Sequence, residues 1–118
     1  MLSHITATAF DPANPSSRSR AIISLLRDDL GFDGLVVTDS VCMWAAQGGI
    51  GVEEAAIASL VAGVDVCIVM ATAGKELSVR NAVIKAVEDG RLSEARLDEA
   101  VLRIIEVKLR HGLGIDTP

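Results

Sequence analysis

The stretch GFDGLVVTDS, residues 31–40, decides the fold class of this chain. Its apolar run from Leu35 to Thr38 is short and follows Gly34, which predicts a buried strand. Asp39 comes directly after the run, so its carboxylate leaves the sheet at the carboxyl end of the strand. Parallel α/β folds build their active sites at that end of the sheet. The stretch therefore predicts an α/β fold and makes Asp39 the first candidate for a functional side chain.

Two other segments have the composition of strands. Leu2 to Ile5 is a short candidate, and Val64 to Met70 is a nearly unbroken apolar run, as in parallel strands that are buried on both faces. A helical pattern follows each strand, and this order implies parallel strands joined by right-handed crossovers. We expect three consecutive β–α units with parallel strands, in one domain spanning residues 1–118.

Capping residues and apolar stripes predict where the helices lie. The expected helices run from Ser16 or Ser17 to Leu30, over residues 52–61, over residues 76–88, and from Ser93 to His111. Gly31 is suited to end the first of them. Residues 41–51 contain glycines at three positions, and we expect this segment to be irregular.

The charge and hydropathy of the chain argue against two classes of partner. The net charge is −5 and no basic face is evident, which argues against a nucleic acid. The apolar runs are too short or too interrupted to span a membrane. The first residues lack the basic start and apolar segment of a signal peptide, and the location in the cell stays open.

The two cysteines, Cys42 and Cys67, do not form a disulfide scaffold pattern. We expect both to be small buried hydrophobic side chains. A metal site would need more Cys and His residues than this sequence contains, so we expect neither a metal nor an organic cofactor.

Three parallel strands make a small sheet with much of its surface uncovered. A closed (β/α)8 barrel repeats such a unit eight times over typically about 250 residues. The chain has 118 residues, so it is expected to be part of a barrel or a small open sheet that needs a partner. The open sheet face is a candidate surface for self-association.

Several segments, in the correct order, resemble a known family. They are Met1 to Ile5, Asp11-Pro12 with Pro15 and Ser17, Leu26-Arg27, residues 30–34, residues 36–39, Ala62-Gly63 with Asp65, Ala86-Val87 with residues 90–92, and Arg103-Ile104. Together they are similar to the last third of the catalytic barrel of the family-3 glycoside hydrolases, the β-N-acetylhexosaminidase and β-glucosidase group. The resemblance implies a carbohydrate substrate and an α/β fold equivalent to the last three units of a TIM barrel.

The resemblance also implies roles for three residues. Asp39 matches the catalytic nucleophile, which in a retaining glycosidase is an ionised carboxylate that forms a glycosyl-enzyme. Met43 matches a methionine that lines the sugar site in hexosaminidase-like members, so N-acetylhexosaminides are the expected substrates. His4 matches a position at the end of the first strand that faces the site, although a structural, hydrogen-bonded histidine fits the residue equally well.

One part of the family pattern does not occur in this sequence. The hexosaminidases of the family resemble one another in a Lys-His motif and in a loop with a His-Asp pair that acts as general acid/base. The two histidines of this chain, His4 and His111, lie in neither. Because glycoside hydrolysis needs a second group beside the nucleophile, we expect the chain to be inactive by itself.

Two other interpretations stay open at this point. One is a receiver-like signalling module, with Asp39 at one strand end and Thr72-Ala73 at another. The other is a non-catalytic interaction protein that associates through its open sheet.

Overall fold

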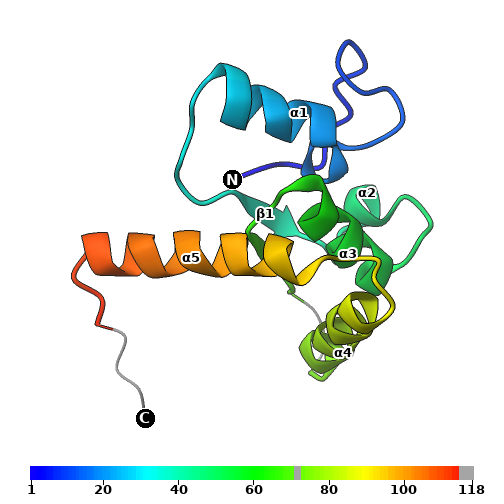
Figure 1. Ribbon diagram of the computed structural model, residues 1–118. Coiled ribbons are helices and arrows are strands. Elements are labelled where there is room, and N and C mark those ends of the chain that lie inside the picture. Colours follow the sequence, from blue (N-terminus) through cyan, green and yellow to red (C-terminus); the bar gives the residue numbers. More distant parts are fainter. Residues whose placement is uncertain (71–72, 115–118) are drawn as a thin grey trace.

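The computed structural model describes residues 1–70 and 73–114 (Figure 1). At its centre lies a parallel sheet of two strands, β1 (Val37–Ser40) and β2 (Val66–Ile68). Val37 pairs with Val66 and Ser40 with Ile68, with an irregularity between the two pairs. The chain therefore has the mixed α/β fold that its sequence predicts, with strands shorter than expected.

The predicted strand at Leu2–Ile5 is reduced to one parallel bridge between Leu2 and Thr38. The N–H of Leu2 donates to Val37 O at 2.7 Å, and the N–H of Asp39 donates to Leu2 O at 2.8 Å. The ladder stops there because the carbonyl of Ile5 accepts instead from the N–H of Ser16, at 2.8 Å. The loop that follows takes the hydrogen bonds that a longer strand would use.

The first predicted helix is divided into three short pieces. They are the 3-10 helix η1 (Ser16–Arg18), the helix α1 (Arg20–Ser24) and the π-helical turn η2 (Leu25–Asp29). The predicted cap at Ser16 or Ser17 is wrong, because Ser19 caps α1 by accepting from the N–H of Ile22 at 3.2 Å. Gly31 follows η2 with a φ of 64°, which suits a glycine at a helix end.

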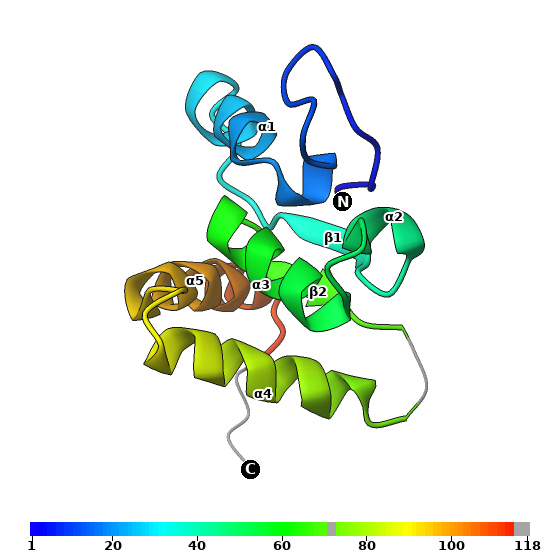
Figure 2. The ribbon, with the colours of Figure 1, turned by 90° about the vertical axis from the view of Figure 1, so that its right-hand side faces the viewer.

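A short helix interrupts the segment that was expected to be irregular. This helix, α2, covers Trp44–Gln47, and Gly48 ends it in the left-handed region with a φ of 53°. Helix α3 (Val52–Ala62) follows and matches the predicted helix within one residue at its end. It packs against β2 and against η1, α1 and α2, so it is the central helix of the molecule (Figure 2).

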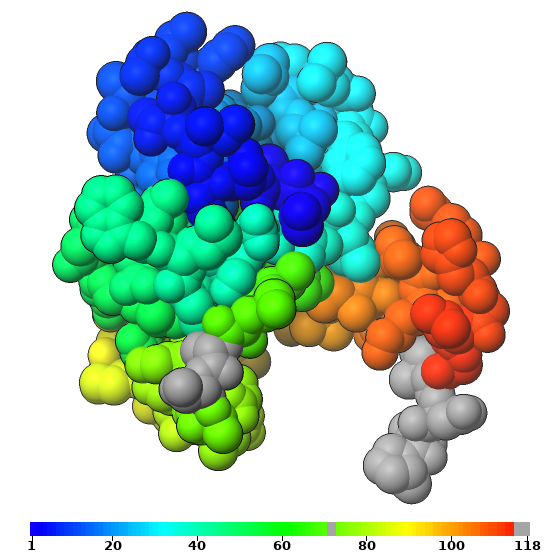
Figure 3. Space-filling model, turned by 180° about the vertical axis from the view of Figure 1, so that it is seen from behind, coloured from blue at the N-terminus to red at the C-terminus, as the bar shows by residue number. Residues whose placement is uncertain are grey.

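Two longer helices complete the fold. Helix α4 (Lys75–Glu88) packs along α3, and helix α5 (Glu94–Arg110) begins at Ser93, whose hydroxyl accepts from the N–H of Arg96 as predicted. In Figure 3 the carboxyl-terminal half of α5, coloured orange to red, projects from the rest of the molecule. No helix of the described residues is long and apolar enough to cross a bilayer.

The buried core consists of three small apolar clusters. Ile23, Val36 and Val64 belong to the first, Val41 and Ala56 to the second, and Ile57, Leu60 and Leu92 to the third. Cys67 of β2 packs against all three clusters. Strand β2, which has the most apolar sequence of the predicted strands, therefore connects the three clusters of the core.

Candidate functional site

Asp39 lies in the second half of β1, at the carboxyl end of the sheet. Its two neighbours on the strand, Thr38 and Ser40, are buried, whereas Asp39 is half-buried. Since side chains alternate along a strand, Asp39 points to the less covered face of the sheet. The N–H of Ser40 donates to Asp39 Oδ1 at 2.6 Å, which fixes the orientation of the carboxylate.

His4 lies next to this strand end. Its Nε2 is 2.9 Å from Ser40 O and its Nδ1 is 2.7 Å from Ser17 Oγ. A carbonyl oxygen can only accept, so Nε2 carries the proton, and in the neutral ring Nδ1 accepts from the hydroxyl of Ser17. Both ring nitrogens thus have protein partners, and the role of His4 in substrate binding stays a prediction.

The backbone of Met43 bonds the same carbonyl group. It precedes α2 in an extended conformation, and its N–H donates to Ser40 O at 3.0 Å. The side chain of Met43 is 47% exposed and that of Trp44 is 84% exposed. Two apolar side chains just after the carboxyl end of β1 are therefore open to solvent, and a role for Met43 in sugar binding stays a prediction.

Ser40 connects these candidates, although no role was predicted for it from the sequence. Its carbonyl accepts from both His4 and Met43, and its hydroxyl accepts from the N–H groups of Cys42 at 3.3 Å and Met70 at 3.2 Å. The structure thus brings the three candidates together at the carboxyl end of β1. The role of Ser40 could have been predicted from its position next to Asp39 at a strand end. A small hydroxyl side chain there can form hydrogen bonds with the backbone of neighbouring loops.

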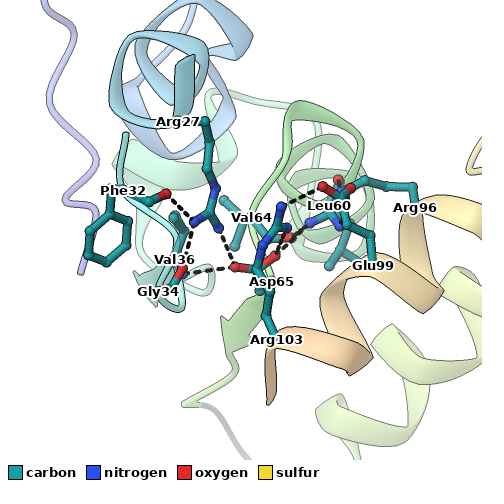
Figure 4. Close-up of polar contacts among 10 residues, drawn as sticks. All are labelled: Arg27, Phe32, Gly34, Val36, Leu60, Val64, Asp65, Arg96, Glu99 and Arg103. Carbon is teal, nitrogen blue, oxygen red and sulfur yellow. Dashed lines mark hydrogen bonds and ion pairs between the residues drawn. The ribbon is translucent and has the colours of Figure 1, made fainter. Parts of the chain in front are cut away.

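A second polar cluster lies at the opposite, amino end of β2 (Figure 4). The side chain of Asp65 is completely buried and forms ion pairs with Arg27 at 2.6 Å, Arg96 at 2.9 Å and Arg103 at 3.0 Å. We call these four residues the Asp65 clasp. Asp65 Oδ2 also accepts from the N–H of Val36 at 2.9 Å. The clasp joins η2, both strands and α5, so its role in this chain is structural.

The arginines of the clasp bond the backbone as well. Arg27 donates to Phe32 O at 2.8 Å and to Gly34 O at 2.6 Å, and Arg96 donates to Val64 O at 2.7 Å. A shallow hollow of about 240 Å³ lies beside them, lined also by Arg20 and Glu99. The sequence feature that could have predicted the clasp is Asp65 itself, a carboxylate between Val64 and Val66 in an apolar run. A carboxylate that is buried with such a run needs positively charged partners.

A model of the glycosyl hydrolase family 3 N terminal domain matches residues 1–107. The chain belongs to this family. The predicted resemblance is therefore confirmed, and it covers most of the chain.

Two curated proteins are similar over nearly the whole chain. A β-N-acetylglucosaminidase/β-glucosidase of Cellulomonas fimi is 33% identical in an alignment of 124 positions that covers 96% of this chain and 22% of that protein. The β-hexosaminidase LpqI of Mycobacterium tuberculosis is 31% identical, over 92% of this chain and 29% of that protein. The chain thus spans less than a third of the length of these two relatives.

Solved structures of family members have the same fold. The family 3 β-N-acetylglucosaminidase of a Paenibacillus species superimposes with a TM-score of 0.84 at 35% identity, over 94% of this chain and 22% of that one. The structure of Mycobacterium tuberculosis LpqI gives a TM-score of 0.78 at 30% identity, over 86% of this chain and 31% of that one.

The receiver-like interpretation depended partly on Thr72, which lies outside the described residues. Membership of the glycosyl hydrolase family favours a glycosidase over a signalling module. Within residues 1–70 and 73–114, no three His, Cys, Asp or Glu side chains come together as metal ligands.

Proposed function

We propose that this chain contributes the nucleophile of a retaining glycosidase that hydrolyses terminal β-linked sugars, N-acetylhexosaminides in particular. Residues 1–118 would form three β–α units of a catalytic (β/α)8 barrel, beginning at Leu2, at β1 and at β2. Asp39 attacks the anomeric carbon, and His4 and Met43 contact the sugar beside it. The observation that carries this proposal is the position of Asp39 at the carboxyl end of a parallel strand in a family 3 domain.

The local geometry supports a nucleophile at this position. A glycosidase nucleophile must present a carboxylate to the sugar with little freedom to move. The backbone of Asp39 is held by Leu2, and its Oδ1 is held by the N–H of Ser40. The substrate class rests on the relatives, since the similar proteins include a β-N-acetylglucosaminidase/β-glucosidase and a β-hexosaminidase.

We propose further that the 118-residue chain is inactive by itself. Hydrolysis needs a second group that protonates the leaving oxygen, and no such group can be assigned beside Asp39 from the family pattern. The apolar surface at Met43 and Trp44 is open, whereas sugar and other small-ligand sites are concave and enclose their ligands. The remaining segments of a catalytic domain would supply both the acid/base and the walls of the site.

A chimera tests this proposal. The matching segment of the Paenibacillus enzyme is replaced by this chain, and hydrolysis of a chromogenic β-N-acetylglucosaminide is measured. We expect turnover by the chimera, none by the chain alone, and a loss of at least about 1,000-fold with Asp39→Asn. Asp33→Asn is the matched control, since Asp33 is exposed and outside the site. An Asp39→Asn chimera with full activity, or turnover by the isolated chain, would contradict the proposal.

A further inference from the structure

Two hydroxyl side chains of β1 accept hydrogen bonds from the backbone of the neighbouring strand and the residues after it. Thr38 Oγ1 accepts from the N–H of Ile68 at 3.2 Å. Ser40 Oγ accepts from the N–H of Met70, also at 3.2 Å. Both hydroxyl residues are buried, and they share one face of β1 because they are two positions apart. Side chains of β1 thus take part in the pairing of the two strands.

The hydroxyl of Ser40 takes the place of the carbonyl of the same residue. In the register with which β1 and β2 begin, the N–H of Met70 would donate to Ser40 O. The register shifts before Ser40, and this N–H donates to Ser40 Oγ instead. The carbonyl therefore remains available, and it accepts from His4 Nε2 and from the N–H of Met43.

These contacts use the full accepting capacity of Ser40. A hydroxyl oxygen has two lone pairs, and those of Ser40 Oγ are taken by the N–H groups of Met70 and Cys42. The carbonyl oxygen also has two donors, at 2.9 Å and 3.0 Å. Ser40 is thereby bonded to three separate segments of the chain, and its backbone has little freedom to rotate.

The backbone of Ser40 in turn sets the direction of the Asp39 carboxylate. The N–H of Ser40 donates to Asp39 Oδ1 at 2.6 Å. Among residues 1–70 and 73–114, no other group donates a hydrogen bond to this carboxylate. A rotation of the Ser40 N–H would therefore move the carboxylate or release it.

We propose that the hydroxyl of Ser40 is a positioning group for Asp39. By accepting from the N–H groups of Met70 and Cys42, it holds the Ser40 backbone in the orientation that directs Asp39 Oδ1. Ser40 is only 6% exposed, so it acts through Asp39 and not by contact with a sugar. This role rests on the proposed function of Asp39 as the nucleophile. All of the contacts lie within this chain, so none depends on the further segments of a longer relative.

Amide hydrogen exchange of the 118-residue chain, measured by NMR, tests the structural half of the proposal. In Ser40→Ala the N–H groups of Met70 and Cys42 lose their acceptor, and we expect them to exchange about tenfold faster or more. The amides of α4 should exchange as before, which separates this local effect from global unfolding. Ser59→Ala is the matched control, because the hydroxyl of Ser59 is also buried and bonds the backbone, donating to Ala55 O at 2.8 Å. It should leave the exchange of Met70 and Cys42 unchanged.

Kinetics of the chimera with the Paenibacillus enzyme test the catalytic half. A misdirected nucleophile reacts slowly with a sugar that still binds, so Ser40→Ala should lower kcat by about 10- to 100-fold and change KM by less than about threefold. Ser40→Thr retains a hydroxyl and should restore most of kcat. Ser59→Ala should keep the kcat of the unmodified chimera, and circular dichroism checks that each variant stays folded.

Four results would overturn the proposal. They are unchanged exchange of Met70 and Cys42 in Ser40→Ala, equal values of kcat in Ser40→Ala and Ser59→Ala, a rise in KM without a loss of kcat, and a folded Ser40→Thr variant no more active than Ser40→Ala. A chimera whose turnover does not depend on Asp39 would contradict the proposed function instead. In that case the exchange of Met70 and Cys42 still decides whether the hydroxyl holds the Ser40 backbone.

Discussion

His4 Nε2 lies 2.9 Å from the carbonyl oxygen of Ser40, the residue that directly follows Asp39. The same ring bonds Ser17 through Nδ1, at 2.7 Å. One side chain therefore connects the first segment, the turn η1 and the carboxyl end of β1. This arrangement makes His4 a residue that positions the strand end.

We expect His4→Ala to lower the free energy of unfolding by about 1 to 3 kcal/mol, because it leaves the buried hydroxyl of Ser17 without its partner. His111→Ala is the matched control, since His111 is exposed after the end of α5, and its effect should stay below about 0.5 kcal/mol. Urea unfolding followed by circular dichroism gives both values. Equal midpoints for the two variants would show that the His4 hydrogen bonds contribute nothing.

The Asp65 clasp leads to a larger expected effect. Asp65→Asn leaves three arginines around a neutral side chain at a fully buried position, and we expect a loss of about 3 to 5 kcal/mol. Asp89→Asn makes the same chemical change in an exposed pair with Lys85, where about 0.5 kcal/mol or less is expected. Thermal and urea unfolding of both variants measure the difference. Comparable losses would mean that the clasp is no stronger than a surface ion pair.

The elements with long, regular patterns could be predicted from the sequence. The apolar stripe and the cap at Ser93 correctly predicted α5, and the run before Gly63 correctly predicted α3. The position of Asp39 at a strand end was also predicted, because a carboxylate after a short apolar run has few other places to lie. These are local signals in the sequence.

The features that depend on distant contacts could not be predicted. The strand at Leu2 is reduced to a bridge because Ser16, far along the chain, takes the carbonyl of Ile5. The first helix is divided where Ser19 caps it, although Ser16 and Ser17 have equal capping propensity. The clasp assembles from four segments, so only the burial of Asp65 between two valines hinted at it.

Glu53 should make stability depend on pH. The hydrogen bond from Ser78 and the contact with Lys75 lower the pKa of Glu53 from 4.5 to about 2. The folded state therefore binds this proton less readily than the unfolded state, and the stabilisation present above pH 4.5 is lost as the pH falls toward 2. Because the pair is partly exposed, we expect less than about 1 kcal/mol.

The difference in unfolding free energy between wild type and Glu53→Gln isolates this effect from that of the other carboxylates. It should be present at neutral pH and shrink below pH 4.5. Glu88→Gln, at an exposed position on α4, serves as the control and should show no such change. A difference that does not change with pH would mean that Ser78 and Lys75 do not act on the charge of Glu53.

The two cysteines should differ in reactivity. Burial raises the pKa of the Cys67 thiol to about 12, so almost no thiolate forms at pH 8, and the side chain packs against all three core clusters. Cys42 lies in the turn between β1 and α2 and belongs to none of the three clusters. Both cysteines are half-buried, so the expectation of two fully buried side chains was wrong. A disulfide reagent such as DTNB should therefore label one thiol quickly in the folded chain and both thiols in urea.

Two variants identify the thiol that reacts. Cys42→Ser should abolish the fast phase of labelling, whereas Cys67→Ser should leave it intact. A fast phase that survives Cys42→Ser would show that β2 opens more readily than its place at the centre of the core implies.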